Sequence, residues 1–455
     1  MQSMTVQQMY ELAIGRQMAG RAREAEALYR QILRIDPANV ASLSMLGALL
    51  GQQGKFAEGF QFARQATQIE PTNENAWGNL AVMLAQNGQL DEAIQGYRKV
   101  LELRPDSFKA HNNLGNTLRA AGRFDEAIEA YRTALRLFPE SGEIHWNLGL
   151  VLLQLGNFEE GWQQYEGRLT AKDFPLHAVF RQPAWDGSDL AGKRILLHAE
   201  QGFGDAIQFV RYVPMVKAHG GRVILRTPRE LVRLFACVGA EQVVAEDQPM
   251  PQFDTHCHLM SLPLRFGTTL TNLPANVPYL SAPPDLLDPW HAKLATLSAG
   301  LKIGLVWAGN PRYPQDRFRS IRLAQLAPLA RVPGITFVSL QKGEASAQAH
   351  VPLQGMRLVD WTRELQDFAD TAALISQLDL IICVDTAVAH LAGALGKRTW
   401  LLLAEPAEWR WMLNRNDSPW YPTMRLFRQS RKGDWDTVVK EVTEAMQENL
   451  RLRIH

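Results

Sequence analysis

Residues suited to binding an anion stand where an apolar run meets a helical pattern: Asp385, Thr386 and Ala387, followed by His390. Residues 386–395 predict a helix, and the first turn of a helix binds phosphate through free N–H groups and the helix dipole. Thr386 and His390 are four residues apart, so we expect both side chains on one helical face, beside a bound diphosphate. The structural alternative is that Asp385 only caps the helix and that His390 is a buried histidine with satisfied hydrogen bonds.

A second junction places a carboxylate among glycines. Residues 200–205 read Glu-Gln-Gly-Phe-Gly-Asp and follow a short apolar run. Gly202 and Gly204 would let the backbone approach a substrate closely. We assign both to acceptor binding, that is, to binding the substrate whose hydroxyl would receive a transferred group. Asp205 could take a proton from an attacking hydroxyl, with Glu200 as the second candidate for this general base. The alternative for Asp205 is a helix N-cap, which aspartate also serves well.

Basic side chains gather after a third apolar run. The segment contains four arginines, Arg312, Arg317, Arg319 and Arg322. Guanidinium groups match phosphate oxygens and could neutralise the charge of a bound phosphate. We predict that Arg317 and Arg319 bind the donor and that Ser320 assists. The alternative is a solvated basic loop, partly paired with Asp316.

Two further segments have weaker claims to chemistry. Gln341 and Lys342 follow another apolar run and could contact a nucleotide or merely form a turn, and we assign both to donor binding. Aromatic residues are concentrated at 409–411 and 417–422. Aromatic rings can stack on sugars or bases, but we interpret these as packing.

These segments follow predicted strands that alternate with helices. Strands are expected at 194–198, 222–226, 302–307, 336–340, 380–384 and 399–403, and helices at 206–217, 228–238, 367–377, 386–395 and 436–450. This alternation predicts parallel sheets with right-handed crossovers, in which ligands bind beyond the carboxyl ends of the strands. A proline-rich stretch, 274–289, separates two α/β halves, and a cleft between them would hold the site.

No metal site is expected. The His-Cys-His run at 256–258 lacks a second ligand pair at zinc spacing. The Asp-Trp-Asp run at 434–436 stands where a helix begins and is interpreted as a cap. The Gly-Phe-Gly run at 202–204 lacks the third glycine of a dinucleotide-binding fingerprint.

The first third of the chain repeats every 34 residues. Proline, leucine and glycine columns keep this step: Pro37, Pro71, Pro105 and Pro139; Leu12, Leu46, Leu80, Leu114 and Leu148; Gly20, Gly54, Gly88, Gly122 and Gly156. The pattern resembles the tetratricopeptide repeat, which implies stacked helix pairs with a concave groove.

One repeat column is not needed for packing: Asn79, Asn113 and Asn147. Side-chain amides stacked on the inner face could hydrogen-bond a peptide backbone, and the column resembles that of the eukaryotic O-GlcNAc transferase repeats. We assign these residues to acceptor binding. The alternative is a solvent-facing column kept by repeat duplication.

Composition narrows the function classes. The chain has 455 residues, of which 46% are hydrophobic and 21% charged, so most of it is expected to fold. The net charge is 48 − 47 = +1, which argues against a dedicated nucleic-acid binder. Three cysteines do not make a disulfide framework, and neither a targeting pattern nor a spanning apolar run is apparent. We therefore expect a cytoplasmic protein without a transmembrane segment.

The segment from Gly202 to Asp205 and the segment from Asp385 to Lys397 resemble the lipopolysaccharide heptosyltransferase family, over roughly residues 193–450. The resemblance implies a GT-B fold and an inverting, metal-independent transferase that uses a nucleotide-sugar donor and no cofactor. It also implies that Asp205 is the general base. His390, one turn into its helix, could hydrogen-bond a phosphate or the transferred sugar, and we assign it to catalysis together with Asp205. The family's usual Asp-Thr-Gly ends in Ala387 here, which still offers its backbone N–H.

The combined prediction is an all-α tetratricopeptide repeat superhelix followed by an α/β GT-B-like pair of Rossmann-type domains. The predicted divisions are 1–170 for the repeats, 171–290 for a linker and the acceptor-side half, and 291–455 for the donor-side half. Tetratricopeptide repeats fused to such a domain resemble bacterial protein glycosyltransferases, which implies transfer of a sugar to a protein hydroxyl held by the repeats. The alternatives are transfer to a lipopolysaccharide or other glycan, or a non-catalytic scaffold.

Overall fold

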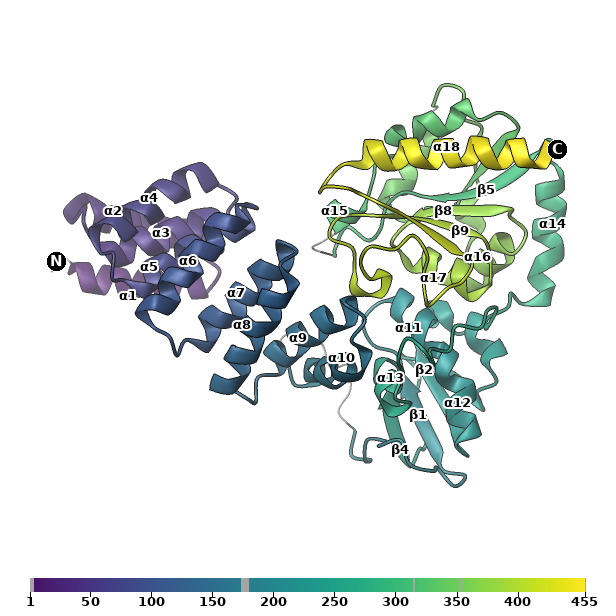
Figure 1. The fold of residues 1–455 in the computed structure, drawn as a ribbon, viewed down its shortest axis with the longest axis horizontal. Coiled ribbons are helices and arrows are strands. Elements are labelled where there is room, and N and C mark those ends of the chain that lie inside the picture. Colours follow the sequence, from purple (N-terminus) through teal and green to yellow (C-terminus); the bar gives the residue numbers. More distant parts are fainter. Residues whose placement is uncertain (1–3, 173–179, 314–315, 352, 455) are drawn as a thin grey trace. The chain divides into compact units, whose positions relative to one another are not determined.

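The structure is a computed structural model that describes residues 4–172, 180–313, 316–351 and 353–454 (Figure 1). The chain divides into two compact units. The first comprises Met1–Leu152 and Gln163–Phe174, and the second comprises Leu153–Trp162 and Pro175–His455. The division passes through the fifth repeat. The sequence-based boundaries at residues 170 and 290 stay a prediction.

The repeats form helix pairs, as the 34-residue period predicts. Their helices are α1 (Val6–Met18), α2 (Ala22–Ile35), α3 (Val40–Gln52), α4 (Phe56–Ile69), α5 (Glu74–Gln86), α6 (Leu90–Leu103), α7 (Phe108–Ala120), α8 (Phe124–Leu137), α9 (Gly142–Gln154) and α10 (Phe158–Tyr165). The glycine column lies in the turn inside each pair at positive φ, for example 74° at Gly20 and 82° at Gly88, where a side chain would be strained. The repeat architecture predicted from the sequence is therefore confirmed.

Successive repeats of the first unit are also joined by a ladder of ion pairs with the same period. Arg30 pairs with Glu58 at 2.6 Å, Arg64 with Glu92 at 3.0 Å, and Arg98 with Glu126 at 3.1 Å. These side chains are largely exposed, so each pair contributes at most about 1 kcal/mol.

The second unit contains two parallel sheets in its described residues. The smaller sheet has the order β3-β2-β1-β4. Its strands are β1 (Arg194–His198), β2 (Arg222–Thr227), β3 (Gln242–Ala245) and β4 (Thr255–His258), and its helices are α11 (Phe203–Phe209), α12 (Val213–Ala218) and α13 (Leu262–Arg265). In register, Ile195 of β1 lies opposite Val223 of β2 and Thr255 of β4.

The larger sheet has the order β10-β9-β8-β5-β6-β7 within the described residues, and all its strands are parallel. The strands are β5 (Leu301–Val306), β6 (Ile335–Ser339), β7 (Leu358–Asp360), β8 (Leu380–Val384), β9 (Thr399–Leu403) and β10 (Met424–Arg428); the helices are α14 (Leu287–Ala295), α15 (Asp316–Arg319), α16 (Phe368–Ile375), α17 (Ala387–Ala394) and α18 (Trp435–Ile454). Alternate residues of β8, Leu380, Ile382 and Val384, share an apolar core with Val438 and Val442. Helix α18 therefore covers this face (Figure 1).

The strand order reverses beside β5. From β5 the chain runs outward through β6 and β7, then returns to β8 on the other side of β5 and continues through β9 to β10. Loops that leave β5 and β8 therefore diverge at the carboxyl edge, which is where open α/β sheets bind ligands. The α/β fold predicted from the sequence is confirmed, and this reversal fixes where its ligand site should lie.

Two predicted helices differ in the structure. The helix expected at 206–217 begins earlier, at Phe203, and is divided by a 3₁₀ turn, Val210–Tyr212, because Pro214 lacks the N–H that a continuous helix needs. The helix expected at 228–238 consists of two 3₁₀ turns, Arg229–Leu231 and Leu234–Val238. A 3₁₀ turn rises about 2.0 Å per residue, more than an α-helix, so few residues are needed to connect β2 to β3.

Of the predicted linker at 174–189, residues 174–179 lie outside the described residues. The rest of this segment contacts the smaller sheet, where the backbone N–H of Trp185 donates to the His256 carbonyl at 2.7 Å. No helix in the described part of the chain combines the length and apolar composition that a membrane span requires.

Candidate active site

The helix that follows β8 begins one residue later than predicted. Thr386 is the N-cap of α17, with an extended backbone at φ −147° and ψ 170°, and its side chain does not cap the helix. Thr386 and His390 therefore do not share a helical face, and Asp385 is not the cap, which corrects both readings of this segment. The Thr386 hydroxyl oxygen is buried and has no hydrogen-bond partner among the described residues. The N-terminus of α17 thus keeps free N–H groups and a free hydroxyl for a ligand.

Asp205 stabilises the start of α11 from inside its first turn, but the N-cap of this helix is Gly202, and the role of Asp205 as general base stays a prediction. One carboxylate oxygen, Oδ2, accepts the Gly202 N–H at 2.8 Å, so Asp205 does stabilise the start of α11. The other oxygen, Oδ1, forms an ion pair with the guanidinium of Arg410 in the larger sheet's half. Each oxygen retains a second lone pair, so a further hydrogen bond to a substrate hydroxyl is possible.

Arg410 is the site residue that sequence reasoning missed. Its guanidinium contacts Asp205, Glu408 at 2.7 Å and Gln208 at 2.6 Å, and it stacks on the Trp409 ring at 4.4 Å. Trp409 and Trp411 are buried, as the packing interpretation of the aromatic residues at 409–411 expects, whereas the sequence analysis assigned no role to Arg410. The sequence did contain a signal for Arg410: it is an arginine in the segment that follows the carboxyl end of β9, the edge at which ligands bind.

His390 lies at the contact between α17 and α11. The ring is 5% exposed, stacks on Trp411 with centroids 5.3 Å apart, and its Nδ1 lies 2.9 Å from the Tyr421 hydroxyl. A Cβ placed on Gly204 would lie only 2.8 Å from His390 Cδ2, so Gly204 is needed where the two helices touch. Burial, with Arg410, Arg211 and Arg319 nearby, lowers the pKa of His390 well below its usual value, which keeps the ring neutral.

Asp385 is electrostatically part of the same site. Burial raises its pKa, and Asp205 adds to this, while Arg319, Trp411 and Arg410 act in the opposite direction. The structure thus brings Asp205 together with Asp385, His390, Arg319 and Arg410. The acceptor contacts assigned to Gly202 and Gly204 stay predictions, because Gly204 has a packing reason of its own.

The two arginines predicted to bind the donor are placed differently. Arg319 donates to Asp316 Oδ1 at 3.1 Å and stacks on Tyr313 at 4.7 Å. Ser320 donates to Asp316 Oδ2 and accepts the Gly309 N–H, both at 2.9 Å, so it holds the loop. Arg317 is exposed and stacks on the Phe318 ring at 4.6 Å. Of Arg317 and Arg319, it is Arg319 that lowers the pKa values of Asp385 and His390.

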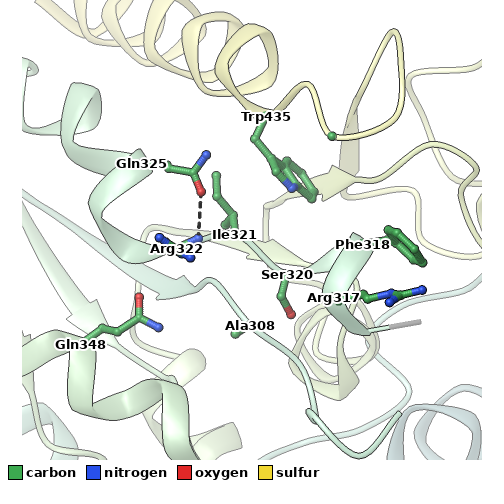
Figure 2. A pocket seen from close by; sticks show the side chains of 10 residues that line it. Ala308, Arg317, Phe318, Ser320, Ile321, Arg322, Gln325, Gln348 and Trp435 are labelled. Atoms are coloured by element: carbon green, nitrogen blue, oxygen red, sulfur yellow. Dashed lines mark hydrogen bonds between the residues drawn. The ribbon is translucent and has the colours of Figure 1, made fainter. Parts of the chain in front are cut away.

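A cavity of about 370 Å³ lies beside this loop, and Arg317 and Ser320 line it. Figure 2 shows Arg317 and Phe318 at one end, Gln348 and Arg322 toward the other, and Trp435 across from them. Arg322 donates its backbone N–H to Gln325 Oε1 at 3.2 Å. This cavity is open to an anionic group, because two arginine side chains border it.

Gln341 has a structural role that its assignment to donor binding did not foresee. Its Oε1 accepts the N–H groups of Trp307 at 3.0 Å and Ala308 at 2.8 Å, and its Nε2 donates to the carbonyls of Ala308 and Lys342 at 2.9 Å. All four hydrogen-bonding positions of the amide are used, so Gln341 has none left for a donor. The Lys342 ammonium donates to the Leu365 carbonyl.

The alternative base Glu200 is also engaged. Its Oε1 accepts the Met260 N–H at 3.1 Å, and its Oε2 lies 3.5 Å from His258. The His-Cys-His run forms β4, and no group of three metal-ligating side chains within the described ranges has a metal-binding arrangement. Asp434 accepts hydrogen bonds from the N–H and hydroxyl of Thr437 at 3.2 and 3.0 Å, which confirms its helix-cap role.

The asparagine column lies in the repeat unit and is only partly free. Asn79 donates to Ser44 at 2.8 Å, and Asn147 donates to Asn112 at 3.2 Å. The position that would serve Asn113 in the same way is Gly78, which has no side chain. Asn113 therefore forms no side-chain hydrogen bond to another described residue, and its peptide contact stays a prediction.

Comparison with known proteins separates the two parts of the chain. Residues 72–140, and residues 10–74 with 112–173, match family descriptions of the tetratricopeptide repeat. Residues 341–420 match glycosyltransferase family 9, the heptosyltransferases. The family 9 match includes Asp385, His390 and Arg410 and does not extend to Asp205. Tetratricopeptide repeats and a heptosyltransferase-family region, both predicted from the sequence, are therefore confirmed.

Similar proteins cover parts of the chain. Protein FlbA of Caulobacter vibrioides is 28% identical over 288 residues, which are 58% of this chain and 48% of FlbA, so the chain spans about half the length of that curated relative. A crystal structure of MamA has a TM-score of 0.32 at 22% identity and covers 35% of this chain and 92% of its own. The protein TTC0263 of Thermus thermophilus has a TM-score of 0.34 at 20% identity, with coverage of 38% and 94%.

Proposed function

We propose that this chain, with its repeats and its family 9 region, is an inverting glycosyltransferase that moves a sugar from a nucleotide-sugar donor to a protein hydroxyl held by the repeats, without a metal. The observation that carries the proposal is the ion pair between Asp205 of one α/β half and Arg410 of the other, beside Asp385 and His390. A carboxylate, a neutral histidine and fixed cations at one helix N-terminus are the groups that glycosyl transfer from a diphosphate requires.

The donor diphosphate is proposed to lie at the N-terminus of α17. The uncapped N–H groups and the unpartnered Thr386 hydroxyl donate to phosphate oxygens. Arg319 supplies a cation for the charge that develops on the leaving group, a role in which a fixed guanidinium can replace a metal ion.

The acceptor hydroxyl is proposed to attack the anomeric carbon on the face opposite the diphosphate. Asp205 takes the hydroxyl proton as the new C–O bond forms and the bond to the diphosphate breaks, which inverts the configuration in one displacement. The ion pair with Arg410 fixes the orientation of the Asp205 carboxylate.

The proposal is tested with full-length protein, a panel of nucleotide sugars and separate protein and glycan acceptors. We expect Asp205→Asn to lower turnover by roughly 100-fold or more, the usual contribution of a general base, and His390→Ala to lower it as well. The matched control Asp434→Asn removes a helix-cap carboxylate elsewhere in the same unit and should keep nearly full turnover. Anomeric NMR of the product should show inversion, and EDTA should have no effect.

Three results would contradict parts of this proposal. Full activity in both Asp205→Asn and His390→Ala would show that the site is wrongly assigned. Transfer only to glycans or lipopolysaccharide would exclude the protein acceptor. The absence of any melting-temperature shift with nucleoside diphosphates would favour a non-catalytic scaffold.

The acceptor side has its own test in Asn113→Ala. Since Asn113 forms no side-chain bond to another described residue, its loss should leave repeat stability nearly unchanged. If the column binds peptide, the variant should raise KM for a protein acceptor about fivefold, the value of one hydrogen bond of about 1 kcal/mol, without changing donor hydrolysis. Asn87→Ala, an exposed asparagine outside the column, is the control. An unchanged KM would indicate that the column serves the repeats alone.

A further inference from the structure

Behind His390 lies a buried chain of polar groups that the proposed mechanism does not use. Arg211 Nη2 lies 3.0 Å from the Tyr279 hydroxyl, which lies 2.9 Å from the Ile207 carbonyl oxygen. The Tyr421 hydroxyl lies 3.5 Å from that of Tyr279 and 2.9 Å from His390 Nδ1. These groups join α11, the proline-rich segment and the segment before β10 to the histidine of α17.

Counting protons along this chain fixes the direction of the hydrogen bonds that Arg211 and Tyr279 donate, and the distances then favour one direction at Tyr421. A tyrosine hydroxyl has one proton to donate, an arginine only donates, and a carbonyl only accepts. Arg211 therefore donates to the Tyr279 hydroxyl, and Tyr279 donates its single hydroxyl proton to the Ile207 carbonyl oxygen. Tyr421 has two acceptors within reach, and His390 Nδ1 is the closer by 0.6 Å (3.5 − 2.9). The shorter distance favours donation from the Tyr421 hydroxyl to Nδ1, which makes Nδ1 the unprotonated nitrogen.

The other ring nitrogen then carries the proton. Burial and the nearby arginines lower the pKa of His390 well below its usual value, so only one nitrogen is protonated at neutral pH. Within the described residues, the ring forms no hydrogen bond other than the one at Nδ1. The Nε2 edge faces the first turn of α11, because a Cβ on Gly204 would lie 3.4 Å from Nε2. This N–H is therefore presented to the first turn of α11.

We infer that Tyr421 is a positioning residue that fixes His390 as the Nε2–H tautomer, so that His390 donates an uncharged hydrogen bond to a diphosphate oxygen of the donor. The use of this bond rests on the proposed function, whereas the tautomer does not. Without the Tyr421 hydroxyl, Nδ1–H and Nε2–H would both be populated, and part of the protein would present a lone pair to the anion instead of a proton.

The first test is long-range proton–nitrogen NMR on the full chain labelled with [15N]histidine, with His390→Asn used to identify the His390 signals. We expect a protonated Nε2 and an unprotonated Nδ1 in the wild type. In Tyr421→Phe the His390 signals should show a tautomer mixture. Tyr212→Phe, which removes a buried hydroxyl bonded to Thr268 at 2.8 Å, should leave them unchanged. A protonated Nδ1 in the wild type would overturn the inference even if no variant folded.

The second test measures donor turnover in the same variants. We expect Tyr421→Phe to lower kcat about tenfold with a smaller change in donor KM, since the bond strengthens as charge develops on the leaving diphosphate, whereas Tyr212→Phe stays near wild type. Equal kcat in Tyr421→Phe and wild type would overturn the positioning role. A wild type with the Nε2–H tautomer but no nucleotide binding would refute the proposed function and leave the tautomer assignment standing.

Discussion

Arg410 connects three side chains of the site through one guanidinium. Asp205 and Gln208 come from α11, and Glu408 comes from the loop after β9, so the contacts of Arg410 join the two α/β halves. Arginine suits this place because its planar fork donates in several directions at once and stays charged when buried. A lysine would offer a point charge and lose most of these contacts. The site is thus preassembled around a cation before any donor binds.

The charge of Asp385 makes stability depend on pH in a defined direction. Its pKa is raised in the folded chain, chiefly by burial, so the folded state holds more protons than the unfolded state between the two pKa values. Stability therefore falls as pH rises through this window. We expect Asp385→Asn, which cannot titrate, to be more stable than wild type in urea unfolding at pH 7.

The difference between Asp385→Asn and wild type should shrink as pH falls toward about 4, the ordinary value for aspartate. Asp436→Asn, at an exposed carboxylate of α18, serves as the control and should show no such trend. An Asp385→Asn variant less stable than wild type at pH 7 would mean that the arginines outweigh the cost of burial.

At the scale of elements, the contact between α11 and α17 holds the site together. Gly204 allows this contact, because a Cβ there would press against the His390 ring at 2.8 Å. We expect Gly204→Ala to destabilise the α/β unit by about 1–3 kcal/mol, the usual cost of overpacking, and to reduce donor turnover by displacing His390. Urea unfolding and donor turnover measure the two effects.

The control for this substitution is Gly78→Ala. An added Cβ at Gly78 meets only Val100 at 3.9 Å, within an α-helix where alanine is favoured. This variant should be at least as stable as wild type. If Gly204→Ala behaved in the same way, the close packing of α11 on α17 would not constrain His390.

At the scale of the whole molecule, residues 153–162 belong to the repeat pattern in sequence and to the α/β unit in structure. Trp162 packs on Trp409 with centroids 5.4 Å apart, on Phe209 at 6.2 Å and on Trp420 at 6.3 Å, and its indole N–H donates to the Thr268 carbonyl at 3.1 Å. Trp409 is the ring on which Arg410 stacks. A deletion of residues 1–170 would therefore remove part of the active unit.

We expect Trp162→Ala to cost about 3–5 kcal/mol, as for other large buried aromatic residues, and to do so in the α/β unit. Hydrogen exchange during urea unfolding, followed peptide by peptide, separates the two units. Tyr97→Ala, at a buried repeat tyrosine, should instead lower protection in the repeats. If Trp162→Ala lowered hydrogen-exchange protection only in the repeats, residues 153–162 would have to be assigned to the first unit.

Local patterns in the sequence predicted the repeats and the inner strands correctly. The 34-residue period is visible because every repeat packs two helices in the same way and so needs the same residue types at the same positions. The strands found from the sequence, β1, β2, β5, β6, β8 and β9, lie inside their sheets and are buried on both faces, so they appear as apolar runs. The strands that were missed, β3, β4, β7 and β10, are the sheet edges, where burial is incomplete along the strand and the apolar run is interrupted.

By itself, the sequence thus determined the architecture and the junctions at which Asp205, Asp385 and His390 stand. Tertiary structure alone decided that Arg410 belongs to the site, that Gln341 is fully engaged in holding the end of β5, and that residues 153–162 pack with the α/β unit. The physical reason is one of distance along the chain. Periodicity and strand runs arise among neighbouring residues, whereas Arg410 and Asp205 are separated by 205 positions and meet only when the two halves fold together.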